Sequence, residues 1–180
     1  MNKVLVVGAL LLCSFTMAKH GPWFSGKIVY HNTFKTLAGD DISAKLTPVF
    51  GSDDPYYISD GNYKMYTENR QLVELYTGAT NQFLFFMKGQ AMPAIDAAAG
   101  TPGTVKLLTQ TTTIVGYPCQ SLQIANEAEG STTEYFYTTK LRVNPERFAR
   151  HALGDFYTYL KAANGGLPCA WLSLIPSRAL

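Results

Sequence analysis

Charged residues are scarce in this sequence, and those present do not cluster. Asp, Glu, Lys and Arg together make up 16% of the 180 residues, and the formal net charge is +2. A run of Lys and Arg is missing, which argues against nucleic acid or an anionic membrane surface as a partner. The aromatic content of 13% excludes a disordered tail or a coiled coil. We therefore expect one folded domain, and a monomer.

Motifs that carry catalysis or bind metals are also missing. The sequence has no His-x-x-x-His pair, no cysteine pair at metal spacing, no Gly-x-Ser-x-Gly elbow and no phosphate-binding glycine loop. His151 precedes Asp155 by four residues, which predicts a surface pair on a helix. Asp53, Asp54 and Asp60 lack the ligand spacing of a calcium loop and are expected to serve turns. The prediction is a protein that is not an enzyme and holds no metal or cofactor.

The first eighteen residues have the three-part pattern of a secretory signal peptide. Lys3 is followed by an apolar run at 4–12 and by small residues before a cleavage position after Ala18. The rival interpretation is a lipoprotein signal lipidated at Cys13, but Leu12 stands where Gly, Ala or Ser is usual. We therefore expect an exported protein with a signal peptide at 1–18 and a single β-rich domain at 19–180.

Cysteine is rare: beyond Cys13 the chain contains only Cys119 and Cys169. An even number of cysteines in an exported chain is typical of proteins whose thiols are oxidised. A Cys119–Cys169 disulfide, two inert buried thiols, and a free Cys169 near the end all remain open from the sequence.

Most of the chain consists of short alternating segments separated by turn residues, which predicts an antiparallel sheet. Segment 23–34 places Phe24, Ile28 and Tyr30 on one face. Asp60-Gly61 predicts a tight hairpin turn within 56–67, and segments 72–77 and 82–87 predict a second hairpin. Segment 51–55 is expected to be a loop, and segment 42–50 fits a helix or a strand.

Two further segments bear on what covers this sheet. Segment 82–87 (QFLFFM) is apolar on both faces, so both sides require a cover. Segment 89–103 is rich in Ala, Gly and Pro and fits either a short helix or a flap.

An amphipathic helix is expected from Asn144, with Pro145 in its first turn and Asn164-Gly165-Gly166 at its end. Its apolar positions at helical spacing are Phe148, Ala152, Phe156, Tyr159, Leu160 and Ala163. The final apolar run at 167–175 is expected to be a strand.

The order of these parts resembles a known superfamily. The opening FSGKIVY strand, the segment YYISDGNYKMY, the GYPC turn, the EYFYTT strand and the GGLP return are similar to exported domains of unknown function in the lipoprotein-carrier (LolA/LolB-like) superfamily. The resemblance implies an unclosed antiparallel β-barrel with helices over an apolar concave face, and a periplasmic location. Superfamily members continue past the return with further strands, whereas this sequence reads CAWLSLIPSRAL, so either an incomplete barrel or an atypical end of the reading frame is expected.

The expected fold is therefore α+β: a curved antiparallel sheet or unclosed β-barrel with a covering amphipathic α-helix. The expected function is binding of a lipid or a lipoprotein acyl chain in the half-barrel. The alternative is a structural or protein-interaction module of the cell envelope with a solid core. The side chains expected to contact the ligand are Tyr30, Tyr57, Tyr66, Leu84, Phe86 and Phe156.

Overall fold

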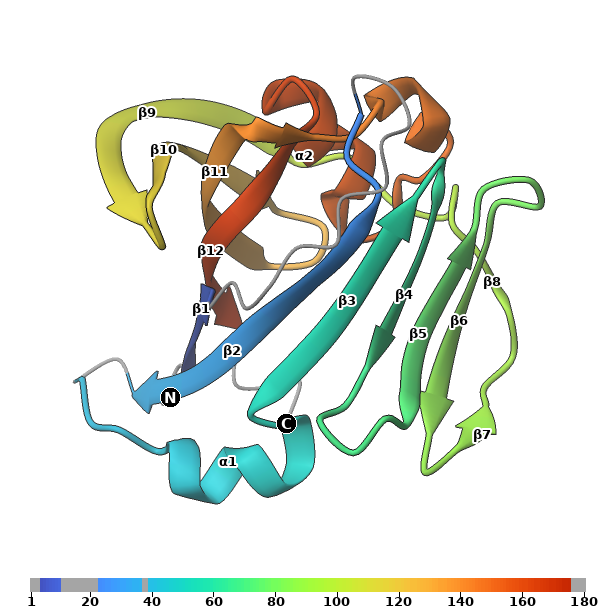
Figure 1. The fold of residues 1–180 in the computed structure, drawn as a ribbon, viewed down its shortest axis with the longest axis horizontal. Coiled ribbons are helices and arrows are strands. Elements are labelled where there is room, and N and C mark those ends of the chain that lie inside the picture. Colours follow the sequence, from blue (N-terminus) through green and yellow to red (C-terminus); the bar gives the residue numbers. More distant parts are fainter. Residues whose placement is uncertain (1–3, 11–22, 37–38, 176–180) are drawn as a thin grey trace.

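The computed structural model describes residues 4–10, 23–36 and 39–175. These residues form a 12-stranded antiparallel sheet that curls without closing (Figure 1). In chain order the strands are β1 Val4–Leu10, β2 Gly26–Thr36, β3 Asp53–Ser59, β4 Asn62–Tyr66, β5 Leu72–Thr77, β6 Gln82–Met87, β7 Gln90–Ala91, β8 Ile95–Asp96, β9 Thr104–Ile114, β10 Tyr117–Asn126, β11 Ser131–Arg142 and β12 Gly166–Ile175. The expected curved, unclosed antiparallel sheet is thus confirmed.

The sheet consists of two meanders joined by one strand. The spatial order is β7-β6-β5-β4-β3-β2-β1-β12-β11-β10-β9, with β8 paired to β6. Strand β1 pairs with β2 on one side and with β12 on the other. It lies within the predicted signal peptide, whereas Cys13 and the cleavage position after Ala18 fall outside the described residues. The signal peptide therefore stays a prediction.

Turn chemistry explains how the first meander folds. Asp60 and Gly61 have φ values of 40° and 80°, which is the left-handed geometry of a two-residue hairpin turn, and they join β3 to β4 as expected. The hairpin of β5 and β6 is confirmed as well. The expected loop at 51–55 is wrong in part, because β3 begins at Asp53 and Pro55 pairs with Val29. Proline is tolerated there because it lies near the start of the strand.

Helical segments are few and short. They are α1 Ser43–Phe50, the 3₁₀ turns η1 Pro145–Phe148 and η2 Leu153–Asp155, and α2 Phe156–Ala162. Asn144 caps η1, accepting a hydrogen bond from the amide of Glu146, as its sequence context predicts. The continuous helix expected from Asn144 is wrong, however. Gly154 and Asp155 both have φ values of 60°, which stop helical propagation between η1 and α2.

The core lies on the concave side of the sheet. Strand β2 buries Ile28, Tyr30, Asn32 and Phe34 on one face, following the alternation read from its sequence. Phe148 and Leu160, from the covering segment 144–163, are almost fully buried in the same cluster. The covering segment passes over one end of the sheet, between the two meanders (Figure 1).

A disulfide joins Cys119 of β10 to Cys169 of β12, spanning the intervening strand β11. Both cysteines are fully buried. The bridge closes a loop of 50 residues, which in the chain-entropy model stabilises the fold by about 4 kcal/mol. The disulfide interpretation is therefore confirmed over the two thiol alternatives, and it indicates an oxidising, exported location.

Candidate functional site

A cavity of about 310 Å³ lies between the concave face of the sheet and helix α2. This volume is at the small end of the range for ligand pockets. Its lining is mostly aromatic and aliphatic, with two carboxyl groups. The lining residues include Tyr30, Asp54, Tyr56, Ile58, Met65, Glu74, Tyr135, Phe156, Tyr159, Leu160, Leu167, Trp171 and Ser173.

Strand alternation and register bring these side chains to one face. Tyr30 lies opposite Asp54 on β3, Tyr56 lies opposite Met65, and Met65 lies opposite Glu74. Because every second side chain of a strand points to the same face, these pairs form two adjacent rows on one face of β2 to β5, Tyr30 with Asp54 and Tyr56 with Met65 and Glu74. The cavity floor therefore follows directly from the hairpin registers.

Aromatic rings form the cavity walls. The ring centroids of Tyr30 and Trp171 lie 4.7 Å apart, and those of Tyr135 and Tyr159 lie 4.4 Å apart. The Tyr159 hydroxyl donates to the Gly166 carbonyl at 2.8 Å. Burial raises the pKa of Tyr135 to about 12 and that of Tyr159 well above its ordinary value. These phenols therefore stay neutral at physiological pH.

Two acids reach the cavity from adjacent regions of the sheet. Asp54 accepts a hydrogen bond from the Asn32 amide at 2.7 Å, whereas Glu74 has no hydrogen-bond partner among the described residues. Burial, and secondarily the nearby Asp54, raises the pKa of Glu74 to about 7. Glu74 is half-buried, with the apolar side chains of Met65 and Phe85 opposite it on the two neighbouring strands. Burial also raises the pKa of Asp54.

The covering segment is fixed to the sheet by a buried histidine. The Nε2 atom of His151 lies 2.8 Å from the Tyr63 hydroxyl, and its ring packs against Tyr76 and Phe156. Its Nδ1 atom is buried without a hydrogen-bond partner. Burial lowers the pKa of His151 to about 4, so the ring is neutral. The predicted surface pair with Asp155 is wrong, since His151 is buried in the core.

Asp155 and Asn81 provide two further attachments. Asp155 accepts hydrogen bonds from the Gly103 amide at 2.6 Å and from the Asn126 side chain at 3.0 Å. Asn81 donates to the Arg150 carbonyl at 3.1 Å and accepts from the Tyr76 hydroxyl at 2.9 Å. Polar side chains thus bind the cover to the tips of several hairpins.

Segment 89–103 packs beneath the same cover. The short helix expected as one alternative is wrong, because the segment contains the short strands β7 and β8 and then an extended stretch. The carbonyl of the fully buried Ala97 accepts hydrogen bonds from the Ala152 and Leu153 amides. This stretch therefore supports the cover, alongside Asp155 and Asn81.

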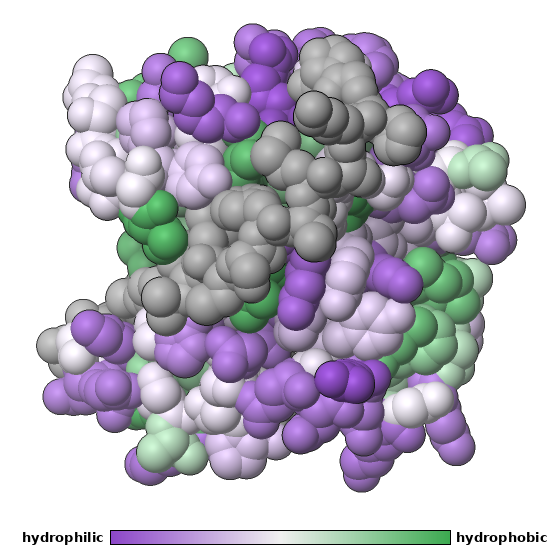
Figure 2. Space-filling view, viewed as in Figure 1, coloured by the Kyte–Doolittle hydropathy of each residue, from purple (hydrophilic) through white to green (hydrophobic). Residues whose placement is uncertain are grey.

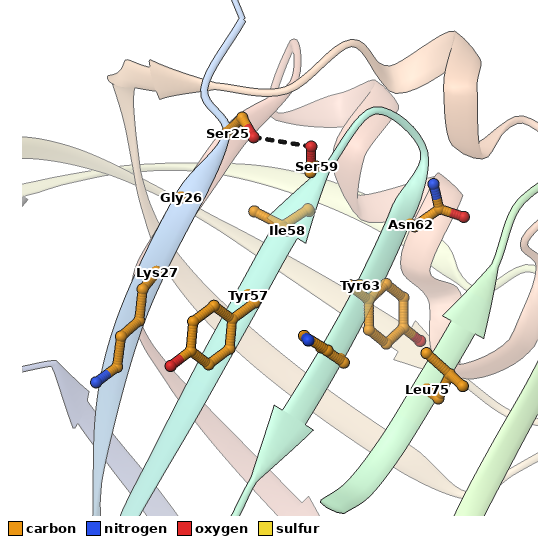
Figure 3. Close-up of a pocket in the computed structure, with 10 residues that line it drawn as sticks. Ser25, Gly26, Lys27, Tyr57, Ile58, Ser59, Asn62, Tyr63 and Leu75 are labelled. Atoms are coloured by element: carbon orange, nitrogen blue, oxygen red, sulfur yellow. Dashed lines mark hydrogen bonds between the residues drawn. The ribbon is translucent and has the colours of Figure 1, made fainter. Parts of the chain in front are cut away.

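A second depression, of about 410 Å³, lies on the outer face of β2 to β5 (Figure 3). Its most prominent side chains are Lys27, Tyr57, Lys64 and Leu75. The Lys64 ammonium lies 5.5 Å from the Tyr57 ring centroid, and that of Lys27 lies 5.9 Å from it. Cationic groups border this groove, whereas the cavity on the concave side carries carboxyl groups.

The six residues expected to contact a ligand fall on two faces of the sheet. Tyr30 and Phe156 line the cavity. Tyr57 and Tyr66 lie together on the outer face, with ring centroids 5.7 Å apart. Leu84 lies opposite Leu75, next to that groove, and Phe86 alternates onto the same side of β6. The structure thus brings two of the six together at the cavity.

The expected residues fall on two faces because successive side chains of a strand point to opposite faces of the sheet. Tyr56 and Tyr57 are neighbours in sequence, and only Tyr56 points into the cavity. Tyr56 pairs with Ile28, which lies on the buried face of β2, so Tyr56 points to that face and Tyr57 away from it. The pairing between two strands cannot be read from the sequence of one strand alone. Glu74 and Trp171 were not among the expected residues, although Glu74 is the one acid within the apolar segment 72–77.

Within the described ranges, no group of three or more His, Cys, Asp or Glu side chains is placed to hold a metal ion. None of the helices in those ranges is long and apolar enough to cross a membrane. Comparison of the chain with family models, with curated proteins and with solved structures gives no match.

Proposed function

We propose that this protein is a periplasmic carrier or receptor that binds an apolar ligand, such as a lipid or a lipoprotein acyl chain, between helix α2 and the concave face of the sheet. The observation that carries the proposal is the cavity of about 310 Å³ walled by aromatic and aliphatic side chains. The aromatic and aliphatic walls surround enough space to bury part of an alkyl chain, which supports binding of an apolar ligand.

The residues proposed to contact the ligand are Tyr30, Tyr56, Phe156, Tyr159 and Trp171, which line the cavity. Tyr30 and Trp171 belong to β2 and β12, the two strands on either side of β1. If the signal peptide is removed after Ala18, β1 leaves with it. The ring contact between Tyr30 and Trp171 joins the two meanders without involving β1.

A dye-binding experiment tests this proposal. Binding of the neutral apolar dye N-phenylnaphthylamine is followed by its fluorescence for the wild type, for Met65→Trp and for Lys64→Trp. Met65 lines the cavity, whereas Lys64 is its neighbour on the outer face of β4. We expect saturable binding that Met65→Trp abolishes and Lys64→Trp leaves intact. Equal binding by both variants, or none by the wild type, contradicts the proposal.

A second candidate function is a protein-interaction module, because apolar side chains also gather on the surface. Figure 2 shows an apolar area over β5 and β6, where Leu75 and Leu84 lie opposite each other. Met87, Met92 and Ile95 are exposed along the same edge of the sheet. Leu84→Lys weakens association with an envelope partner if this candidate is correct and leaves dye binding unchanged. Pull-down from envelope extract with the wild type and with Leu84→Lys measures the association with a partner.

A further inference from the structure

We propose that the cavity selects a single-chain amphiphile with an ammonium head group over one with a carboxylate. The inference rests on the proposed function, since it requires that the cavity binds a ligand. It specifies the charge of the ligand, which an apolar lining alone leaves open.

The charge of the cavity lining carries the first step. Asp54 and Glu74 line the cavity, and its described lining includes no Lys, Arg or His. Lys27 and Lys64 are both on the outer face of the sheet, at the other groove. An anionic head group in the cavity would thus meet two carboxyl groups without a compensating cation, whereas an ammonium would be paired.

The state of Glu74 carries the second step. Its carboxyl group has no hydrogen-bond partner among the described residues and is partly buried opposite the apolar side chains of Met65 and Phe85. Partial burial beside apolar side chains disfavours the charged carboxylate unless a group of opposite charge is present. A ligand that donates a hydrogen bond or a positive charge to Glu74 supplies the missing partner.

The aromatic walls carry the third step. Tyr30, Tyr56 and Trp171 present rings to the cavity, with centroids of Tyr30 lying 5.9 Å from Tyr56 and 4.7 Å from Trp171. Aromatic faces attract alkylated ammonium groups through cation–π interactions, and cages of such rings are the usual recognition device. Rings and carboxyl groups together therefore favour the same ligand charge, while Leu160 and Leu167 provide apolar contacts for the alkyl chain.

A series of ligands with the same alkyl chain tests the inference on the full chain, in the Trp23→Phe background and in the wild type. Decyltrimethylammonium, decanol and decanoate are titrated below their aggregation concentrations, and binding is followed by the fluorescence of Trp171. Trp23→Phe removes the other tryptophan, which is exposed outside the cavity. At pH 8, where Glu74 is mostly ionised, we expect the ammonium compound to bind at least about tenfold more tightly than decanoate, as one charged hydrogen bond provides.

Charge variants extend the test. Glu74→Gln is expected to weaken decyltrimethylammonium binding about tenfold and decanol binding much less, because the Gln oxygen still accepts a hydrogen bond from a hydroxyl but carries no charge. Glu127→Gln, at an exposed turn, is the matched control and should change neither. If Glu74→Gln does not fold, the wild-type comparison of the three ligands still decides the question.

The pH dependence gives an independent readout. Between pH 8 and pH 5 Glu74 becomes protonated, so the preference for the ammonium compound should fall. The titratable groups that interact with Glu74 are Asp54 on β3 and the phenols of Tyr56 and Tyr63, and the phenol of Tyr159 lines the same cavity. Burial raises the pKa of all three phenols, so they do not titrate in this range.

The outcomes separate the two proposals. Tighter binding of the ammonium compound, lost in Glu74→Gln, supports the inference. Decanoate binding as tightly as the ammonium compound, with decanol also bound, overturns the inference and leaves the proposed function standing. No binding of any of the three compounds overturns both.

Discussion

Replacement of His151 should reveal how the buried cover responds to pH. His151 is 2% exposed, and burial lowers its pKa to about 4, below the ordinary value of 6.5. The unfolded chain therefore binds more protons than the native protein between pH 6.5 and pH 4. The His151 contribution to the free energy of unfolding is complete above pH 6.5 and falls as the pH is lowered through this window.

The magnitude follows from the same two pKa values. Lowering the pH from 8 to 5 should reduce the His151 contribution by about 2 kcal/mol. Urea unfolding at both pH values measures it in the wild type, in His151→Gln and in the control His31→Gln, whose imidazole is partly exposed beside Asp53. We expect the loss at low pH to be smaller by about 2 kcal/mol in His151→Gln than in the wild type. Equal losses in wild type and His151→Gln would refute the assignment of a neutral buried imidazole.

Three further predictions concern the cavity, the disulfide and the end of α2. The pKa of Glu74 is raised to about 7, so the native state favours the neutral carboxyl group. The resulting contribution to the free energy of unfolding is complete below pH 4.5 and is lost as the pH rises through 7. Urea unfolding of Glu74→Gln should therefore show greater stability than the wild type at pH 8, by about 3 kcal/mol, and a smaller difference at pH 5; a constant difference would contradict this. The double replacement of Cys119 and Cys169 by Ser should lower the free energy of unfolding by about 4 kcal/mol, measured in the same denaturant; an unchanged value would mean that the bridge does not form. Gly165→Ala should lower the midpoint of thermal unfolding, because φ is 76° and the added Cβ would clash with the Val143 carbonyl. Gly116→Ala, which shares the positive φ but has open space around it, is its control and should cost less.

Local sequence signals predict the strands and turns of this protein well. Asp60-Gly61 dictates its hairpin turn because few other residues tolerate that backbone geometry. The alternation of Ile28 and Tyr30 correctly identifies the buried face of β2. In both cases the deciding interaction lies within a few residues along the chain.

Features that depend on distant contacts could not be predicted in this way. His151 and Asp155 have helical spacing, yet their partners are Tyr63, Gly103 and Asn126, far away in sequence. These contacts accompany three short helical segments, η1, η2 and α2, where the spacing of apolar residues predicts one continuous helix.

Which of two neighbouring aromatic residues points to the concave face of the sheet also depends on contacts with distant parts of the chain. Tyr56 and Tyr57 are equally apolar, and only the register of β3 with β2 and β4, which places Tyr56 opposite Ile28 and Met65, decides which one lines the cavity. The resemblance to the lipoprotein-carrier superfamily stays a prediction, because the curved sheet alone agrees with it.

The central claim is that a ligand occupies the cavity beneath α2. A crystal structure of the protein with bromodecyltrimethylammonium, located by the anomalous signal of bromine, tests it most directly. We predict the head group beside Glu74 and the alkyl chain between Tyr56, Tyr159 and Trp171. Bromine located only in the outer groove at Tyr57, or on the surface of β5 and β6, would contradict the account.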